Sequence, residues 1–189
     1  MIHCKIVYVG PALAGKSSNL RHIHAHIPEE DHGKLIVLST ETERMLFFDL
    51  RLPAITPFRG RGLRFHLCTH PGVAFFESNR KFILRGVDGL VFVADSQKER
   101  LEANIDSLAT LASDLDEQGH RLVDLPMVMQ YNKRDLPSAL PSAELDAAIN
   151  PGSRDRFAAS ATDGFGVLDT LKATAQQVAA RLPATFPNS

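Results

Sequence analysis

Two largely apolar runs most constrain the fold of this chain. Residues 89–95 and 125–132 consist mainly of aliphatic and aromatic side chains, without alternation between apolar and polar positions. Strands that are buried on both faces of a parallel sheet have this pattern. Residues 99–118, between the two runs, carry leucine and isoleucine at spacings of three and four, which predicts an amphipathic helix ending near Gly119. These segments together predict a strand–helix–strand unit with parallel strands.

The rest of the chain adds strands and helices to this unit. Residues 2–9 alternate and predict a first strand, while residues 45–50 and 63–68 predict two strands close enough to form an antiparallel hairpin. The polar segment 28–44 is long enough to move, and a last helix is expected over residues 167–182. We therefore expect a three-layer α/β fold with a six-stranded, mostly parallel sheet flanked by helices.

Composition indicates one ordinary globular domain. The 189 residues are expected to form a single domain spanning residues 1–189, with residues 183–189 as a short tail. Because the formal net charge is only -1, the chain lacks the basic footprint of a nucleic-acid-binding protein. Cys4 and Cys68 lie in alternating apolar stretches, where cysteine usually acts as a small buried hydrophobe, so we expect a reduced, cytoplasmic protein.

No direct membrane anchor is expected. The N-terminal strand is too short and too interrupted to be a signal peptide, and no run of about 20 apolar residues occurs. Residue 2 is Ile2 rather than the glycine needed for myristoylation, and the last cysteine, Cys68, is far from a prenylation site. Recruitment to a membrane would therefore depend on a partner protein.

The segment between the first strand and the following helix matches a phosphate-binding loop. The pattern is a glycine, four residues, and then glycine, lysine and serine. Backbone N–H groups and the helix N-terminus surround phosphate oxygens in such a loop. Lys16 would reach the outer phosphates of a nucleoside triphosphate, and the Ser17 hydroxyl would bind Mg²⁺. The residues expected to contact the phosphates are Gly10, Ala12, Leu13, Ala14, Gly15, Lys16, Ser17 and Ser18.

A second motif selects the base. Asn132, Lys133 and Asp135 stand at the end of the fifth predicted strand. The Asp135 carboxylate can accept two hydrogen bonds, from guanine N1–H and from the exocyclic amine, whereas adenine offers no such pair of donors. Ser160 and Ala161 resemble the loop that supports guanine from its other side. We therefore expect bound GTP or GDP rather than an adenine nucleotide.

Together these motifs resemble those of the Ras superfamily of small GTPases. Within it, residues 33–44, 46–49 and 86–96 are similar to the MglA-like bacterial GTPases of gliding motility and cell polarity, and the resemblance runs from residue 2 to residue 182. It implies a Ras-like P-loop fold, a GTP/GDP switch that uses Mg²⁺, effector proteins, and a roadblock-domain activating partner of the MglB type.

The resemblance also implies roles in the first switch. Arg44 corresponds to an arginine finger supplied by the same chain, and such a finger contributes about 10³ to 10⁵ in rate. The alternative is a solvated loop arginine. Met45 stands where the family has a threonine, so Thr40 or Thr42 would have to supply the switch hydroxyl.

The third guanine-nucleotide motif of the family corresponds to residues 69–72. Thr69 occupies the position where most Ras-like proteins have an aspartate that helps hold Mg²⁺, and the MglA-like family also has threonine there. We assign Thr69 to the catalytic set and Gly72 to the nucleotide contacts. The Mg²⁺ shell would then consist of Ser17, phosphate oxygens and water.

Two departures from the family pattern predict slow hydrolysis. Val73 replaces the glutamine that orients the attacking water, and its side chain cannot form a hydrogen bond. Ala12 replaces a glycine, and its methyl group crowds the space used by the glutamine and the finger. His70 could orient water instead, although a loop histidine is more often structural or solvated.

Three functions are compatible with these residues. The first is a cycling GTPase switch, and the second is a GTP-binding scaffold in which Ala12 and Val73 disable turnover. The third is a nucleotide or metabolite kinase that uses the same phosphate loop. The guanine-selecting residues 132–135 weigh against the kinase.

Overall fold

The computed structural model describes residues 1–39, 44–55, 60–71 and 77–182. The strands are β1 (Ile2–Val9), β2 (Ile36–Ser39), β3 (Arg44–Leu50), β4 (Leu63–Thr69), β5 (Gly89–Asp95), β6 (Met127–Asn132) and β7 (Arg156–Ala158). The α-helices are α1 (Lys16–His26), α2 (Glu77–Leu84), α3 (Leu101–Asp116), α4 (Ser142–Ile149) and α5 (Val167–Ala180), and short 3₁₀ helices are η1 (Glu29–Asp31), η3 (Lys98–Arg100) and η4 (Leu122–Asp124).

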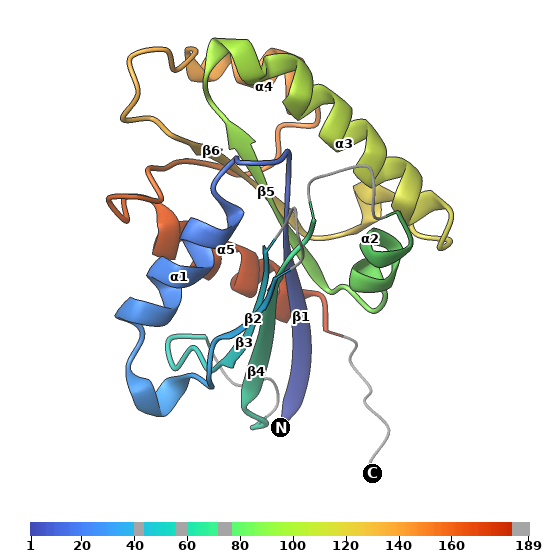
Figure 1. Ribbon diagram of the computed structural model, residues 1–189. Coiled ribbons are helices and arrows are strands. Elements are labelled where there is room, and N and C mark those ends of the chain that lie inside the picture. The colour runs from blue at the N-terminus through green and yellow to red at the C-terminus, as the bar shows by residue number, and fades with distance from the viewer. Residues whose placement is uncertain (40–43, 56–59, 72–76, 183–189) are drawn as a thin grey trace.

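The strands form one twisted sheet between two layers of helices (Figure 1). Its order is β2-β3-β4-β1-β5-β6-β7, with antiparallel pairing for β2/β3 and β3/β4 and parallel pairing elsewhere. The expected hairpin is confirmed, with Phe47 opposite Cys68. The sequence thus predicted the α/β class and its mostly parallel sheet correctly.

The sheet has seven strands where six were expected. Strand β2 lies inside the segment that we interpreted as polar, and all four of its residues are exposed. As an edge strand with one neighbour and no buried face, β2 shows no alternation by which the sequence would reveal it. Helices α2 and α4 were also missed, because each has only eight residues, about two turns.

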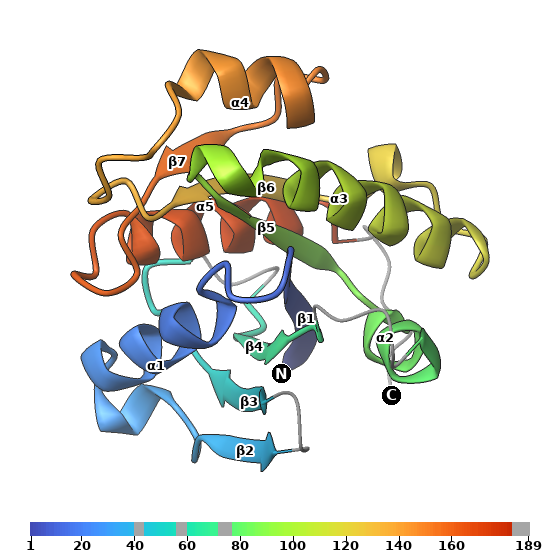
Figure 2. The ribbon, with the colours of Figure 1, turned by 45° about the horizontal axis from the view of Figure 1, so that its top comes forward.

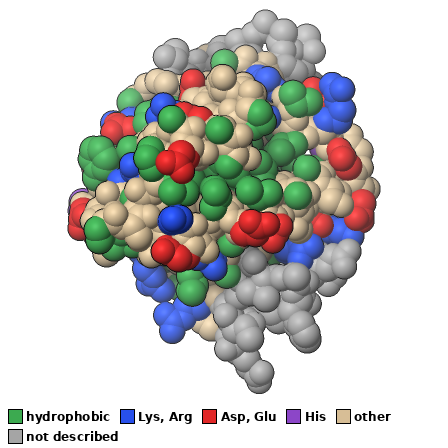
Figure 3. Space-filling view, turned by 90° about the horizontal axis from the view of Figure 1, so that it is seen from above, with side chains coloured by type: hydrophobic (Ala, Val, Ile, Leu, Met, Phe, Trp, Pro, Cys, Tyr) green, Lys and Arg blue, Asp and Glu red, His purple; other side chains and the backbone are tan. Residues whose placement is uncertain are grey.

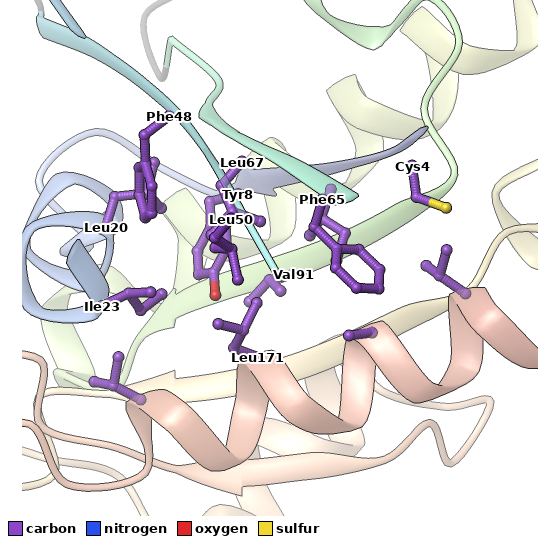
Figure 4. Close-up of a cluster of buried hydrophobic side chains, with 14 of the residues drawn as sticks. Cys4, Tyr8, Leu20, Ile23, Phe48, Leu50, Phe65, Leu67, Val91 and Leu171 are labelled. Carbon is purple, nitrogen blue, oxygen red and sulfur yellow. The ribbon is translucent and has the colours of Figure 1, made fainter. Parts of the chain in front are cut away.

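Helices cover both faces of the sheet (Figure 2). Helices α1 and α5 pack on one face, where Leu171 of α5 and Ile23 of α1 contact the cluster around Tyr8 and Phe65 (Figure 4). Helices α2, α3 and α4 pack on the other face. Every residue of β5 is buried, as its apolar pattern predicted.

The two cysteines lie in different apolar clusters on opposite faces of the sheet. Cys4 belongs to the cluster under α5, and Cys68 to the one under α2 and α3. Both are free thiols, and burial raises the pKa of each to about 11. They therefore stay protonated near neutral pH and act as the small buried hydrophobes that were expected.

The parallel strands bring several loops to one edge of the sheet. Strands β1, β4, β5, β6 and β7 all end at this carboxyl edge, where open α/β sheets bind ligands. Viewed onto this edge, the surface carries hydrophobic side chains interspersed with charges of both signs (Figure 3). The candidate site lies here.

Candidate functional site

The loop after β1 approaches the central strand too closely for any side chain at its first position. Gly10 has a φ of +133°, and a Cβ there would lie 2.2 Å from the carbonyl oxygen of Val93. Past this turn, the backbone N–H groups of Ala12, Leu13 and Gly15 donate to no acceptor within the described residues. Unpaired N–H groups next to a helix N-terminus suit phosphate oxygens.

Lys16 begins α1 and turns back over the loop. Its Nζ donates to the carbonyl oxygens of Gly10 at 2.8 Å and Pro11 at 2.7 Å, and its side chain is buried. These bonds hold the ammonium at the mouth of the loop, where outer phosphates would lie.

Ser17 and Ser18 follow Lys16 in the first turn of α1. Ser17 is partly exposed and Ser18 is exposed, so both hydroxyls can reach a ligand at the helix N-terminus. In the described part of the chain, no group of three or more His, Cys, Asp or Glu side chains could hold a metal ion. A hydroxyl oxygen and phosphate oxygens suit Mg²⁺, which usually keeps several waters, so Ser17 fits the expected magnesium contact.

Asn132 joins three separate segments through its side chain. Its Nδ2 donates to the carbonyl oxygen of Ala14 at 2.7 Å, and its Oδ1 accepts from the Ala161 N–H at 2.8 Å. The side chain is almost fully buried, and a Cβ on Gly15 would lie 2.2 Å from its Nδ2. Asn132 therefore ties the phosphate loop and the 160–166 loop to the end of β6.

The residues after Asn132 include Asp135, the carboxylate expected to bind the base. Lys133 has a φ of +64°, which is uncommon for a non-glycine residue, and its Nζ lies 2.6 Å from the Asp95 carboxylate. The next residue, Arg134, donates its N–H to the carbonyl oxygen of Ala159 at 3.0 Å. Asp135 is exposed, so its carboxylate is available to a ligand at the sheet edge.

Ser160 and Ala161, expected to support the base from its other side, lie in the loop after β7. Both are buried, and the Ser160 hydroxyl donates to Asp163 at 2.9 Å. The Ser160 N–H also donates to the carbonyl oxygen of Phe165 at 3.0 Å. These bonds close a tight loop whose backbone faces Asn132.

Thr69 and Arg44 lie where the hairpin meets this edge. The buried Thr69 hydroxyl accepts the Leu46 N–H at 2.9 Å, which fixes the end of β4 to β3. Thr69 also pairs with Tyr8, two residues before Gly10. Arg44 begins β3 opposite Ser39 and is exposed, so its side chain is free to reorient at the nucleotide edge.

Comparison with known proteins decides the family. Mutual gliding-motility protein MglA of Myxococcus xanthus (strain DK1622) is 52% identical over 181 residues, which cover 96% of this chain and 93% of that protein. The chain belongs to the MglA family of small Ras-like GTPases. ADP-ribosylation factor-like protein 4D of Mus musculus is 30% identical over 176 residues, covering 88% of this chain and 79% of that protein. No protein-family model matches the chain.

His70 is buried in this MglA-family GTPase. Its N–H donates to the Tyr8 carbonyl oxygen at 2.8 Å, and its Nε2 is buried with no partner among the described residues. Burial, followed by the positive charge of Lys16, lowers the pKa of His70 to about 3. The neutral, enclosed ring does not face the solvent, which favours the structural alternative over orientation of water.

Several expected residues lie outside the described part of the GTPase. These are Gly72 and Val73 in the third motif, Thr40 and Thr42 in the first switch, and the tail 183–189. Met45, by contrast, is described and packs against the cluster on the α2 and α3 face.

The sequence interpretation assigned no role to two residues at this edge. Asp95 ends β5, and its carboxylate accepts a hydrogen bond from Lys133 Nζ. The guanidinium of Arg100 donates to the Ala12 carbonyl oxygen at 2.8 Å. A carboxylate at the end of an otherwise apolar buried strand was a signal for Asp95. Arg100 had no comparable signal, since its contact depends on how α3 packs against the phosphate loop of this MglA relative.

The sequence also led us to expect no direct membrane anchor. Across the described ranges, no helix has the length and apolarity required to cross a bilayer.

Proposed function

We propose that this MglA-family protein is a guanine-nucleotide switch that hydrolyses GTP slowly until a partner accelerates it. The observation that carries the proposal is the Asn132 side chain, which bonds both the phosphate loop and the Ala161 backbone. Asp135 follows Asn132 by three residues and is exposed, which supports its proposed role in binding the base of the same ligand. A ligand that offers both phosphates and a guanine ring matches this arrangement.

Different residues of the chain would bind the phosphates, the base and the metal ion. The N–H groups of the loop and Lys16 would bind the phosphates, and Asp135 would accept the two guanine donors. Ser17 would hold Mg²⁺, which when bound neutralises charge on the outer phosphates. Ser160 and Ala161 would support the base from the other side.

Slow unassisted hydrolysis follows from two side chains. Val73 cannot orient a water molecule through a hydrogen bond, and the Ala12 methyl crowds the space beside the outer phosphate. Thr69 would support the catalytic end of β4, and Arg44 would swing inward as a finger that stabilises developing negative charge. The exposure of Arg44 supports such a movement.

The biological role is proposed from the relative whose name includes gliding motility. We propose that this protein acts in gliding motility or cell polarity, with a roadblock-domain partner of the MglB type as its activator and effectors that bind the GTP form. It would work in the cytoplasm, and partners rather than an anchor of its own would recruit it to a pole or membrane.

A second candidate function has a specific observation in its favour. Val73 and Ala12 would both impair the chemical step, while Lys16, Ser17 and Asp135 would still bind the nucleotide. A protein of this kind would hold GTP and dock effectors without cycling.

Single-turnover hydrolysis of bound GTP with Mg²⁺ separates the two candidates. An unassisted Ras-like rate is about 3 × 10⁻⁴ s⁻¹. A roadblock partner that raises the rate by about 10³ or more, with loss of that gain in Arg44→Ala but not in the surface control Arg121→Ala, supports the switch. GTP that stays intact for hours with the partner present, together with faster turnover in Val73→Gln, supports the scaffold.

A further inference from the structure

A buried carboxylate stands between the two loops that would hold the nucleotide. Asp95 ends β5, the strand between β1 and β6, and its side chain is 1% exposed. Ionised carboxylates are costly to bury unless cations or hydrogen-bond donors surround them. The groups that compensate Asp95 therefore indicate what it positions.

The first of these groups belongs to the base-reading loop. Lys133 places its Nζ 2.6 Å from Asp95 Oδ2, and this pair is only partly open to solvent. Lys133 holds a left-handed backbone conformation between Asn132 and Asp135. Such a conformation is disfavoured for a lysine, so an attractive contact at the tip of the side chain helps to retain it.

The second group reaches the phosphate loop. Arg100 Nε lies 3.8 Å from Asp95 Oδ2, while Arg100 Nη2 donates to the Ala12 carbonyl oxygen at 2.8 Å. One guanidinium thus lies between the carboxylate and the loop backbone. This bond restrains the orientation of the Ala12 carbonyl and therefore the backbone of the phosphate loop.

Further hydrogen bonds fix both the backbone and the carboxylate of Asp95. Asn104 of α3 accepts the Asp95 N–H at 2.9 Å and donates to the Asp95 carbonyl oxygen at 2.8 Å. Gln97 donates its backbone N–H to Asp95 Oδ1 at 3.1 Å. Asp95 is therefore a fixed point in the β5–α3 core, and the two cations are the movable partners.

We propose that Asp95 is a positioning residue for nucleotide retention: through Lys133 and Arg100 it holds the base-reading loop and the phosphate loop in their binding conformations at the same time. This inference rests on the proposed nucleotide binding. The guanine base and the inner phosphates are common to GDP and GTP, so loss of Asp95 accelerates the release of both nucleotides.

The test is the dissociation rate of a fluorescent N-methylanthraniloyl GDP, chased with excess GDP, and of the matching non-hydrolysable GTP analogue. For Asp95→Asn we expect about a tenfold faster release of both nucleotides, the size expected for loss of one partly buried charge-assisted contact. Asp124→Asn is the matched control, since Asp124 pairs with Arg121 on an exposed surface, and its rates stay at the wild-type value.

Arg100→Gln keeps the inference testable if Asp95→Asn does not fold, because the Arg100 side chain is one-third exposed. We expect faster release from Arg100→Gln and recovery toward wild type in Arg100→Lys. In the double variant Asp95→Asn/Arg100→Gln the two effects are less than additive, which a general loss of stability would not produce. If the effects of the two substitutions on the release rate are additive in the double variant, Asp95 and Arg100 do not act together and the proposal is wrong.

Two further outcomes separate this inference from its premise. A wild-type chain that binds neither nucleotide overturns the proposed function. A wild-type chain that binds both, with folded Asp95→Asn and Arg100→Gln variants that release at the wild-type rate, overturns only the role of Asp95.

Discussion

At the scale of single residues, a few side chains connect distant parts of the chain. Asn132 bonds both the loop after β1 and the loop after β7. Sequence patterns predicted Asn132 as a nucleotide contact, because the motif is local. They did not show that both polar atoms of its side-chain amide bond the protein backbone.

Asp135→Asn should change the choice of base. The amide replaces one of two acceptor oxygens with a donor, so it no longer matches the two donors of guanine. We expect GDP affinity to fall about 100-fold, and xanthosine diphosphate, which has a carbonyl in place of the amine, to bind more tightly than it does to the wild type. Fluorescence competition measures both, with Asp116→Asn, an exposed site on α3, as the control. Unchanged preference for guanine would contradict the assignment.

His70 should make folding stability depend on pH. Burial lowers the pKa of His70 in the folded state to about 3, whereas a histidine in the unfolded chain has a pKa of about 6.5. Between these two pH values the unfolded chain binds a proton at His70 and the folded chain does not. Stability is therefore lost as pH falls, by about 2 kcal/mol between pH 7 and pH 5. Urea unfolding of His70→Asn should show a flatter dependence over this range, and an equal slope in both proteins would refute the assignment.

At the scale of elements, the sequence predicted the buried strands and the amphipathic helix but not the exposed edge strand. Strands β5 and β6 are buried along their whole length, and α3 carries a regular apolar stripe, so their sequences predicted them. No residue of β2 is fully buried, and the strand pairs with β3. Its existence follows from tertiary hydrogen bonds rather than from a local pattern.

The junction of β1 and the phosphate loop should not tolerate a side chain. In Gly10→Ala the Cβ would meet the Val93 carbonyl oxygen, and the positive φ is unfavourable for alanine. We expect a loss of about 3 kcal/mol or more in the free energy of unfolding. Gly152→Ala is the control, because no heavy atom lies within 4 Å of a Cβ there. The measurement is the urea midpoint of unfolding for each variant. A similarly small decrease in the midpoint of both variants would contradict the close contact at Gly10.

At the scale of the whole molecule, nucleotide binding should stabilise the fold, since its contacts come from both ends of the chain. GDP with Mg²⁺ at about 100 times its Kd adds about 2.7 kcal/mol, or about 5 to 10 °C in Tm for a domain of this size. Chelation of Mg²⁺ should reduce this shift in the wild type but not in Ser17→Ala. A shift in Ser17→Ala that still depends on Mg²⁺ would place the metal contact elsewhere.

The sequence by itself determined the α/β class, the phosphate loop and the buried central strands, because each is encoded by neighbouring residues with a fixed spacing or period. The base-reading motif, which is equally local, stays a prediction. Only the tertiary structure decided the seventh strand, the bonds of Asn132 to two distant loops, the burial of His70, and the contacts of Asp95 and Arg100. These features join segments far apart in the chain. Their geometry depends on how the sheet and α3 pack, which no local pattern records.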